Sequence, residues 1–281
     1  MSTVDPRIAR AQRAQRLRGP RGLLLAAGIA LAHFALWALA GFGAGQLLDI
    51  FRLMAINQAG EGWDSPYDGG PLLFVIGVLG GSLLGFVLTT TLTRMTSLPA
   101  AMIAPFLTAA AGLAAGLALF SSLWTPPEMI GYRRGVAGAE HEPWDAGAWI
   151  HYTAPIWLPM LFAVIAFALA IWFALALARS HRKARIAAEL LESGRKVRGS
   201  VTEVLSTGME VNGLPFVHFT VSFPDASGTT RWVTKKGSFP HADVPRAGDV
   251  AAVWFDPLRP DDEQRIMVGL GPDAASVATA P

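Results

Sequence analysis

The sequence predicts a membrane α + β protein, in which a four-helix transmembrane bundle precedes a small SH3-like or OB-like antiparallel β-barrel. Three observations lead to this prediction. Of the 281 residues, 52% are hydrophobic and 16% are charged, whereas an average soluble domain has about 25% charged residues. The hydrophobic residues gather in four long runs. After the fourth run, apolar and polar residues alternate, which is typical of half-buried strands.

Four segments are long enough to cross a membrane as helices, namely 22–48, 71–93, 99–124 and 153–178. A helix rises about 1.5 Å per residue, so about 20 apolar residues cross a hydrocarbon core of roughly 30 Å. No Asp, Glu, Lys or Arg interrupts any of the four segments. A helix also satisfies its own backbone hydrogen bonds in lipid. Residues 22–178 are therefore predicted to form a transmembrane domain.

The cationic residues indicate the orientation of these spans. One side of the membrane receives Arg94, the basic segment 1–21, and the residues Arg179, Arg182, Lys183 and Arg185. The opposite loops contain only Arg52, Arg133 and Arg134. Because cytoplasmic loops carry the excess of Lys and Arg, both termini are predicted to be cytoplasmic. Arg179, Arg182, Lys183 and Arg185 are expected to contact the membrane surface.

Glycines recur at intervals of four residues within the predicted spans. Gly77, Gly81 and Gly85 lie on the second span, and Gly112 and Gly116 lie on the third. Small residues at this spacing let helix backbones approach closely. The glycines are expected to pack the helices within the bundle, and homo-oligomerisation through the same stripes is the alternative.

His33 is the ionisable residue in the middle of the first span. An ionisable residue inside a membrane is by default a functional hypothesis. No acidic residue or second histidine lies at a matching depth. We therefore expect a neutral packing histidine, bonded to a backbone carbonyl or to a hydroxyl such as that of Ser82 or Thr89. A proton or ion role, in a small transporter or channel component, is the alternative.

The predicted outer loops, 49–70 and 125–152, contain tryptophans close to the membrane boundary. Tryptophan at this depth commonly places its ring among the lipid headgroups. Trp63, Trp144 and Trp149 are therefore expected to be interfacial anchors.

No motif in the sequence indicates catalysis. We find no nucleophile elbow, no phosphate-binding glycine loop and no HExxH motif. The chain has no cysteine, which excludes disulfides and cysteine-based metal sites. His141, His151 and the neighbouring glutamates lack the spacing of metal ligands. We expect no catalytic residue, no cofactor and no metal, and hence no enzyme.

After the fourth span, a helical stalk is predicted over 179–194, because good helix formers run up to Gly194, a residue that favours a left-handed cap. The β-barrel follows over 195–270, and 271–281 is predicted to be a disordered tail. Five or six short strands are expected, from the segments 196–205, 208–223 (a hairpin around Asn212 and Gly213), 229–236, 250–255 and 264–268. Asp256 and Pro257 are expected to form a turn in which the aspartate accepts a backbone N–H two residues on.

The strand at 229–236 mixes cations with an aromatic residue. Alternation places Trp232 and Lys236 on one face, and Arg231 and Lys235 on the other. No single basic stacking platform results, so we do not expect nucleic-acid binding. These cations are expected to contact anionic membrane lipid instead.

Several segments after the fourth span form a recognisable set, namely ELLESGRKVRGSVTEV, NGLPFVHFTVSF and VPRAGDVAAVWFDP, together with the Asp256-Pro257 and Arg259-Pro260 pairs. Through these segments, residues 189–270 resemble a family of bacterial membrane proteins known by its domain of unknown function, DUF3592. The resemblance implies a few helices beside a small β-rich domain in a bacterial cytoplasmic membrane, and it implies no catalytic residues. A weaker similarity to NfeD-type cytoplasmic barrels implies partner binding. Together these features favour a non-catalytic interaction or regulatory module, with lipid and another membrane or cytoplasmic protein as partners.

Overall fold

The structure is a computed structural model that describes residues 19–57, 69–133, 141–211 and 213–270. It divides into two compact units, Met1–Ala178 and Arg179–Pro281, here called the helical unit and the β-unit. The predicted tail 271–281, most of the basic segment 1–21, and the anchor Trp63 lie outside the described residues.

Four helices in the described part of the chain are long and apolar enough to cross a membrane, as expected of a multi-pass membrane protein. They are α2 (Pro20–Asn57), α3 (Gly70–Leu92), α4 (Leu98–Ser121) and α6 (Ala154–Ser193). The short strands β1 (Tyr132–Arg133) and β2 (Glu142–Pro143) pair with each other, and α5 (Ala146–Tyr152) precedes α6. The prediction of four apolar helices is thus confirmed.

Two helices differ from their predicted bounds. Helix α2 continues past residue 48 to Asn57, because the charges of Asp49 and Arg52, which appeared to mark a loop, neutralise each other on the helix. Helix α6 joins the fourth span and the predicted stalk in one helix of 40 residues. Gly194 is not among the glycines with positive φ, so the predicted left-handed cap is wrong.

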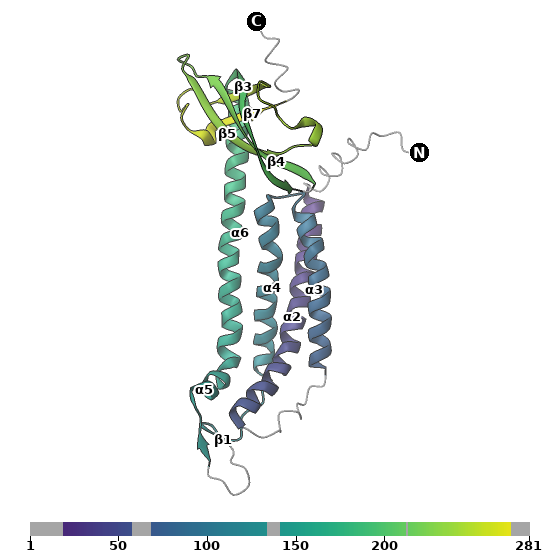
Figure 1. Cartoon of the computed structure of the whole chain (residues 1–281). Helices are drawn as coiled ribbons and strands as arrows, with labels where there is room; N and C mark the ends of the chain where they lie inside the picture. The colour runs from purple at the N-terminus through teal and green to yellow at the C-terminus, as the bar shows by residue number, and fades with distance from the viewer. Residues whose placement is uncertain (1–18, 58–68, 134–140, 212, 271–281) are drawn as a thin grey trace, which may run out of the picture. The chain divides into compact units, whose positions relative to one another are not determined.

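Helices α2, α3 and α4 pack side by side (Figure 1). All five predicted packing glycines lie against α2. A Cβ at Gly77 would meet the Ala40 backbone nitrogen at 2.5 Å, and a Cβ at Gly112 would meet the Phe34 carbonyl oxygen at 2.5 Å. Such close approach of backbones supplies the dispersion contacts that hold helices together in lipid.

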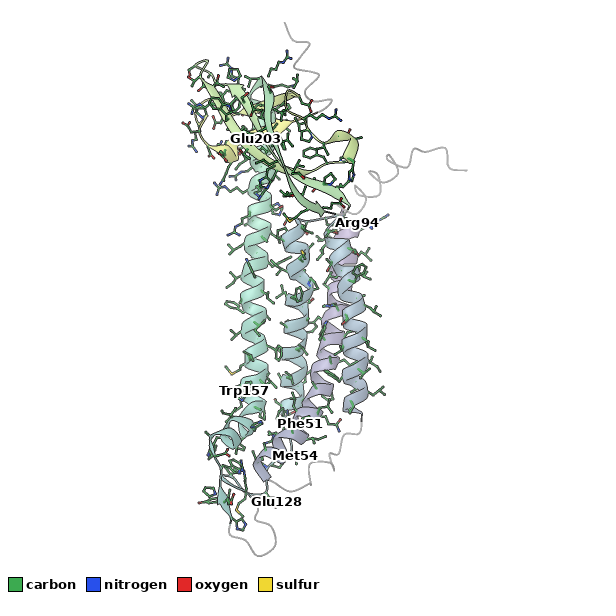
Figure 2. The ribbon with its side chains drawn as sticks, in the orientation of Figure 1. Phe51, Met54, Arg94, Glu128, Trp157 and Glu203 are labelled. Atoms are coloured by element: carbon green, nitrogen blue, oxygen red, sulfur yellow. The ribbon has the colours of Figure 1, made fainter. Side chains whose placement is uncertain are left out.

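In the described part of the chain, α6 makes no comparable contact with these three helices. Its apolar side chains, among them Trp157, are exposed (Figure 2). The segment 154–178 of α6 contains no glycine. It therefore lacks the grooves through which the other helices approach each other. The close-packed bundle is made of three helices, whereas the sequence predicted four.

Replacing Gly112 with alanine should force α2 and α4 apart, because the new Cβ would meet backbone atoms of Phe34 and Ala38 that cannot rotate away. We expect Gly112→Ala to lower the free energy of unfolding by about 1–3 kcal/mol. The matched control is Gly28→Ala, since a Cβ at Gly28 would meet nothing within 4 Å. Thermal unfolding in detergent measures both variants. Equal melting temperatures would contradict the close approach.

The β-unit contains one antiparallel sheet. Its strands are β3 (Arg195–Val211), β4 (Leu214–Pro224), β5 (Thr230–Ser238), β6 (Val250–Phe255) and β7 (Ile266–Gly269), in the order β5-β4-β3-β6-β7. The sheet has five strands because β3 includes both the predicted first strand and the first arm of the hairpin. Two register shifts interrupt the pairing of β3 with β4. Bulges of this kind bend a strand and increase its twist.

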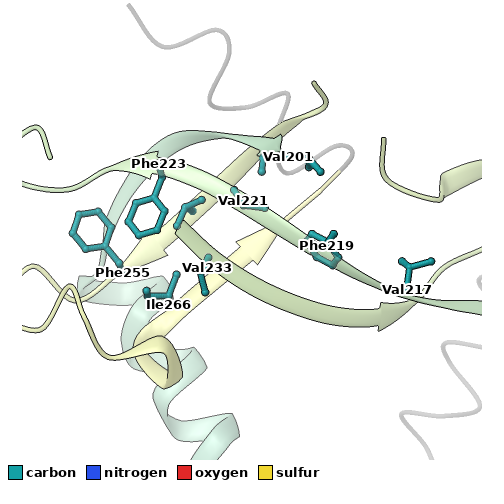
Figure 3. Close-up of a cluster of buried hydrophobic side chains, with 10 residues drawn as sticks. Val201, Val217, Phe219, Val221, Phe223, Val233, Phe255 and Ile266 are labelled. Carbon is teal, nitrogen blue, oxygen red and sulfur yellow. The ribbon is translucent and has the colours of Figure 1, made fainter. Parts of the chain in front are cut away.

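The sheet curls around an apolar core (Figure 3). Its buried members are Val201, Val217, Phe219, Val221, Phe223, Val233, Ala251, Val253, Phe255 and Ile266. On β4, alternate residues point inward, as the sequence pattern predicted. The predicted Asp256 turn is also confirmed, because the Leu258 N–H donates to Asp256 Oδ1 at 3.0 Å.

The curled sheet is a half-barrel and not the closed barrel that was expected. Strands β5 and β7 are its edges, and no ladder joins them among the described residues. Side chains connect the two edges instead. Lys235 Nζ donates to the Glu263 carbonyl oxygen at 2.7 Å, and Arg231 pairs with Asp261. These bridges hold β5 near the 3₁₀ turn Glu263–Arg265, which directly precedes β7.

Candidate functional site

The β-unit contains a cavity of about 820 Å³, lined by the end of α6, strands β4, β5 and β7, and the turn before β7. Its volume falls in the range of small-molecule sites, roughly 300–1,000 Å³. Five of its lining side chains are cationic, namely Arg179, Arg182, Lys183, Lys235 and Lys236. A single acidic residue, Glu263, joins them. We call this site the basic cavity.

Helix α6 contributes one face to the basic cavity. Arg179, Arg182 and Lys183 form its first turn, and Ile186, Ala187 and Leu190 continue it. These six residues follow the spacing i, i+3, i+4, i+7, i+8 and i+11, so they lie on one side of the helix. Ile186 and Leu190 are buried, whereas the three cations are exposed. The face is therefore basic where it follows the apolar run of α6 and apolar farther on.

Strand β5 contributes the other two cations. Alternation sends Lys235 and Lys236 to opposite faces of the sheet, yet both line the cavity. Strand β5 is an edge strand of the sheet. Burial lowers the pKa of Lys235, and the charges of Glu263 and Asp262 oppose that shift. The ammonium group still has donors to spare beyond its bond to the Glu263 carbonyl.

Most cations of the cavity have no acidic partner. Within the described residues, Arg179, Arg182, Lys183 and Lys236 form no ion pair. Arg185, the fourth residue predicted to contact the membrane surface, lies outside the cavity lining and pairs with Glu189 at 3.4 Å. Unpaired like charges repel one another, so the arrangement is suited to binding an anion. In the sequence, the cations of α6 and those of β5 form two separate groups. Only the helical spacing of Arg179, Arg182 and Lys183 indicated that these three share one face of a helix.

His33 lies on α2 and is buried against α3 and α4, with 2% of its surface exposed. The Trp37 indole N–H donates to His33 Nε2 at 3.1 Å. Nδ1 lies 2.7 Å from the Thr108 hydroxyl, which itself donates to the Ala104 carbonyl. The hydroxyl partner is therefore Thr108, and neither Ser82 nor Thr89 takes that place. Both ring nitrogens of His33 therefore have hydrogen-bond partners on the helices α2 and α4.

The described tryptophan anchors take different positions. Trp149 is exposed, in keeping with an interfacial role, but Trp144 is buried. Trp144 packs with Ile56 and Ala148, and its indole N–H donates to the Ile56 carbonyl oxygen at 2.9 Å. The extension of α2 beyond residue 48 provides this contact. Trp144 thus fastens α5 to the end of α2 and does not face lipid.

A buried ion pair at the end of α2 was missed by the sequence reasoning. Asp49 and Arg52 are 2% and 3% exposed. Arg52 Nε and Nη2 donate to Asp49 Oδ1 at 3.0 and 2.9 Å, while the N–H and hydroxyl of Thr125 donate to Oδ2 at 2.9 and 2.8 Å. The guanidinium also bonds the Thr125 carbonyl and lies over the Trp124 ring. The i, i+3 spacing of opposite charges was the available signal. Because Thr125 bonds both Asp49 and Arg52, the network fastens α2 to the end of α4.

Asp225 is the strongly hydrogen-bonded acid of the β-unit. Hydrogen bonds from the Ser227 hydroxyl (2.6 Å) and from Arg231 Nε (2.9 Å) hold the pKa of Asp225 well below its usual range, against the opposing effect of burial. The unfolded chain therefore takes up a proton at a higher pH than the folded chain. This contribution to stability is present above about pH 4 and is lost as the pH falls through the folded pKa.

We expect the melting temperature of the β-unit to fall as the pH drops below about 4, toward the lowered pKa of folded Asp225. Asp225→Asn should lower the melting temperature at neutral pH and flatten its acid dependence. Asp243→Asn removes an exposed carboxylate of the same unit and is the control. Calorimetry of the full chain in detergent measures these transitions. An unchanged acid dependence in Asp225→Asn would contradict the assignment.

No protein-family model matches the chain, and no curated protein or solved structure is significantly similar to it.

Proposed function

We propose that the chain is a multi-pass protein of the bacterial cytoplasmic membrane, with both termini in the cytoplasm, whose β-unit is a non-catalytic interaction or regulatory module at the membrane surface. The basic cavity carries this proposal. It combines unpaired cations from α6 and β5 in a volume large enough for a ligand group. The cationic residues beside the predicted spans support the orientation.

A small transporter or channel component is the competing function. It would depend on His33, whose two ring nitrogens are engaged by Trp37 and Thr108 in helix packing. No observation on the described residues favours a polar path through the helices. The interaction module is therefore the function that the geometry supports better.

Co-purification from native membranes tests the proposal. The full chain, tagged at its N-terminus, is compared with a chain that ends at Gly194 and so keeps α6 but lacks the sheet. We expect a stoichiometric protein partner to co-purify with the full chain and not with the truncated chain. The same partner, purified separately, should rebind the full chain and not the truncated chain. Identical partners with both chains, or none with either, would overturn the interaction role of the β-unit.

A further inference from the structure

The basic cavity has two properties that constrain its ligand. It presents five cations against one carboxylate, so the ligand is an anion. Its helical cations occupy the first turn after the apolar run 154–178 of the same unbroken helix. That run is about 37 Å long at 1.5 Å per residue, enough to cross a hydrocarbon core of roughly 30 Å. Arg179 then lies at the level of the lipid headgroups.

Cations from the helix and from the sheet line the basic cavity together. Arg182 and Lys183 extend from α6, while Lys236 extends from the edge of β5, and all three are exposed and unpaired within the described residues. Lys235 is partly buried and fixed by its bond to the Glu263 carbonyl. Arginine and lysine together are well suited to phosphate, since the guanidinium binds oxygens in pairs and the ammonium acts as a point charge.

We infer that the basic cavity binds the phosphate group of an anionic phospholipid headgroup. The inference deepens the proposed function and rests on it, since it takes Arg179 to lie at the membrane surface. The buried residues Ile186 and Leu190 close the part of the cavity farther along α6. The headgroup thus reaches the sheet through the basic turn of the helix. Occupancy would make the β-unit a sensor of anionic lipid.

Native mass spectrometry of the detergent-purified full chain tests this inference, with phosphatidylglycerol as the anionic probe and phosphatidylcholine as the neutral one. The test variant carries Arg182→Gln, Lys183→Gln and Lys236→Gln. The matched control carries Arg198→Gln, Arg246→Gln and Arg259→Gln. The control also loses three positive charges, but from exposed positions of the same unit that lie outside the cavity lining.

We expect one phosphatidylglycerol to bind per full chain in preference to phosphatidylcholine. The cavity variant should bind it roughly a hundredfold more weakly, since each of the three cations near a headgroup contributes about a fivefold step. The control variant should keep its affinity. An equal loss in both variants would show general attraction to charge and overturn the inference. Resistance to trypsin confirms that each variant remains folded.

Competition with inorganic phosphate is the second part of the experiment, because free phosphate offers the cations the same anionic oxygens as a phospholipid headgroup. Competition by phosphate only far above the lipid concentration supports the headgroup as ligand. Phosphate that binds at the cavity while phosphatidylglycerol does not would overturn the lipid inference.

The interaction proposal and the lipid inference can fail independently of each other. A protein partner that depends on the sheet, with no selective lipid binding, removes only the lipid inference, whereas selective lipid binding with no partner removes only the protein-interaction role.

Discussion

Arg52→Ala should lower the free energy of unfolding of the helical unit by about 3–5 kcal/mol. The arginine is the cationic half of a buried pair, and Asp49 would remain buried without its counter-charge. The bond from the guanidinium to the Thr125 carbonyl would be lost too, together with the stacking over Trp124. We therefore expect a large fall in the thermal unfolding temperature in detergent, and separation of the ends of α2 and α4 before the rest of the bundle.

Arg133→Ala is the matched control for Arg52→Ala. Arg133 also pairs with an aspartate, at 2.8 Å, but that partner, Asp145, is mostly exposed. Water screens an exposed pair, so its loss should cost about 1 kcal/mol or less. If Arg52→Ala were as mild as the control, the pair at the end of α2 would not be shielded from water, and the fastening role of the network would be wrong.

Asp49 and Arg52 also show where sequence reasoning ends. Charged residues normally end a transmembrane segment, so the predicted span stopped at residue 48. The two charges instead satisfy each other one turn apart, and the helix continues. The i, i+3 spacing could indicate the pair itself, but not its bonds to Thr125, which lies 76 residues beyond Asp49 in sequence.

The elements themselves were easier to predict, because each depends on local pattern. Lipid leaves the backbone no alternative to helix, so the four apolar runs were enough. The glycines on three of these runs also correspond to the three helices that pack, while 154–178, which has none, remains apart. The basic cavity depends instead on bringing α6 beside β5, and nothing local in either segment specifies that neighbour.

The curl of the sheet could be predicted only in part from the sequence. Alternation predicted which residues of β4 point inward. It did not predict that β3 would run on as one strand of 17 residues, with two register shifts. Nor did it predict that β5 and β7 would be joined by side chains such as Lys235 in place of a backbone ladder.

Phe255→Ala should destabilise the β-unit by about 3–5 kcal/mol. Phe255 is fully buried on β6, and its ring centroid lies 5.4 Å from that of Phe223 in the centre of the core (Figure 3). A loss of this size is a large part of the stability of a small domain, typically about 5–15 kcal/mol. We expect a protease to digest the sheet while the helical unit survives, because the two units are separately compact.

Leu258→Ala is the control, since Leu258 follows the same strand and is 91% exposed. It should leave protease resistance unchanged. Joint unfolding of both units in Phe255→Ala would contradict their independence.

The same variant also tests whether lipid binding requires the folded basic cavity or only the basic turn of α6. Arg179 and its neighbours would remain on α6, but Lys235 and Lys236 would no longer be held opposite them. Selective retention of phosphatidylglycerol should then be lost, and its persistence would assign lipid binding to the helix alone.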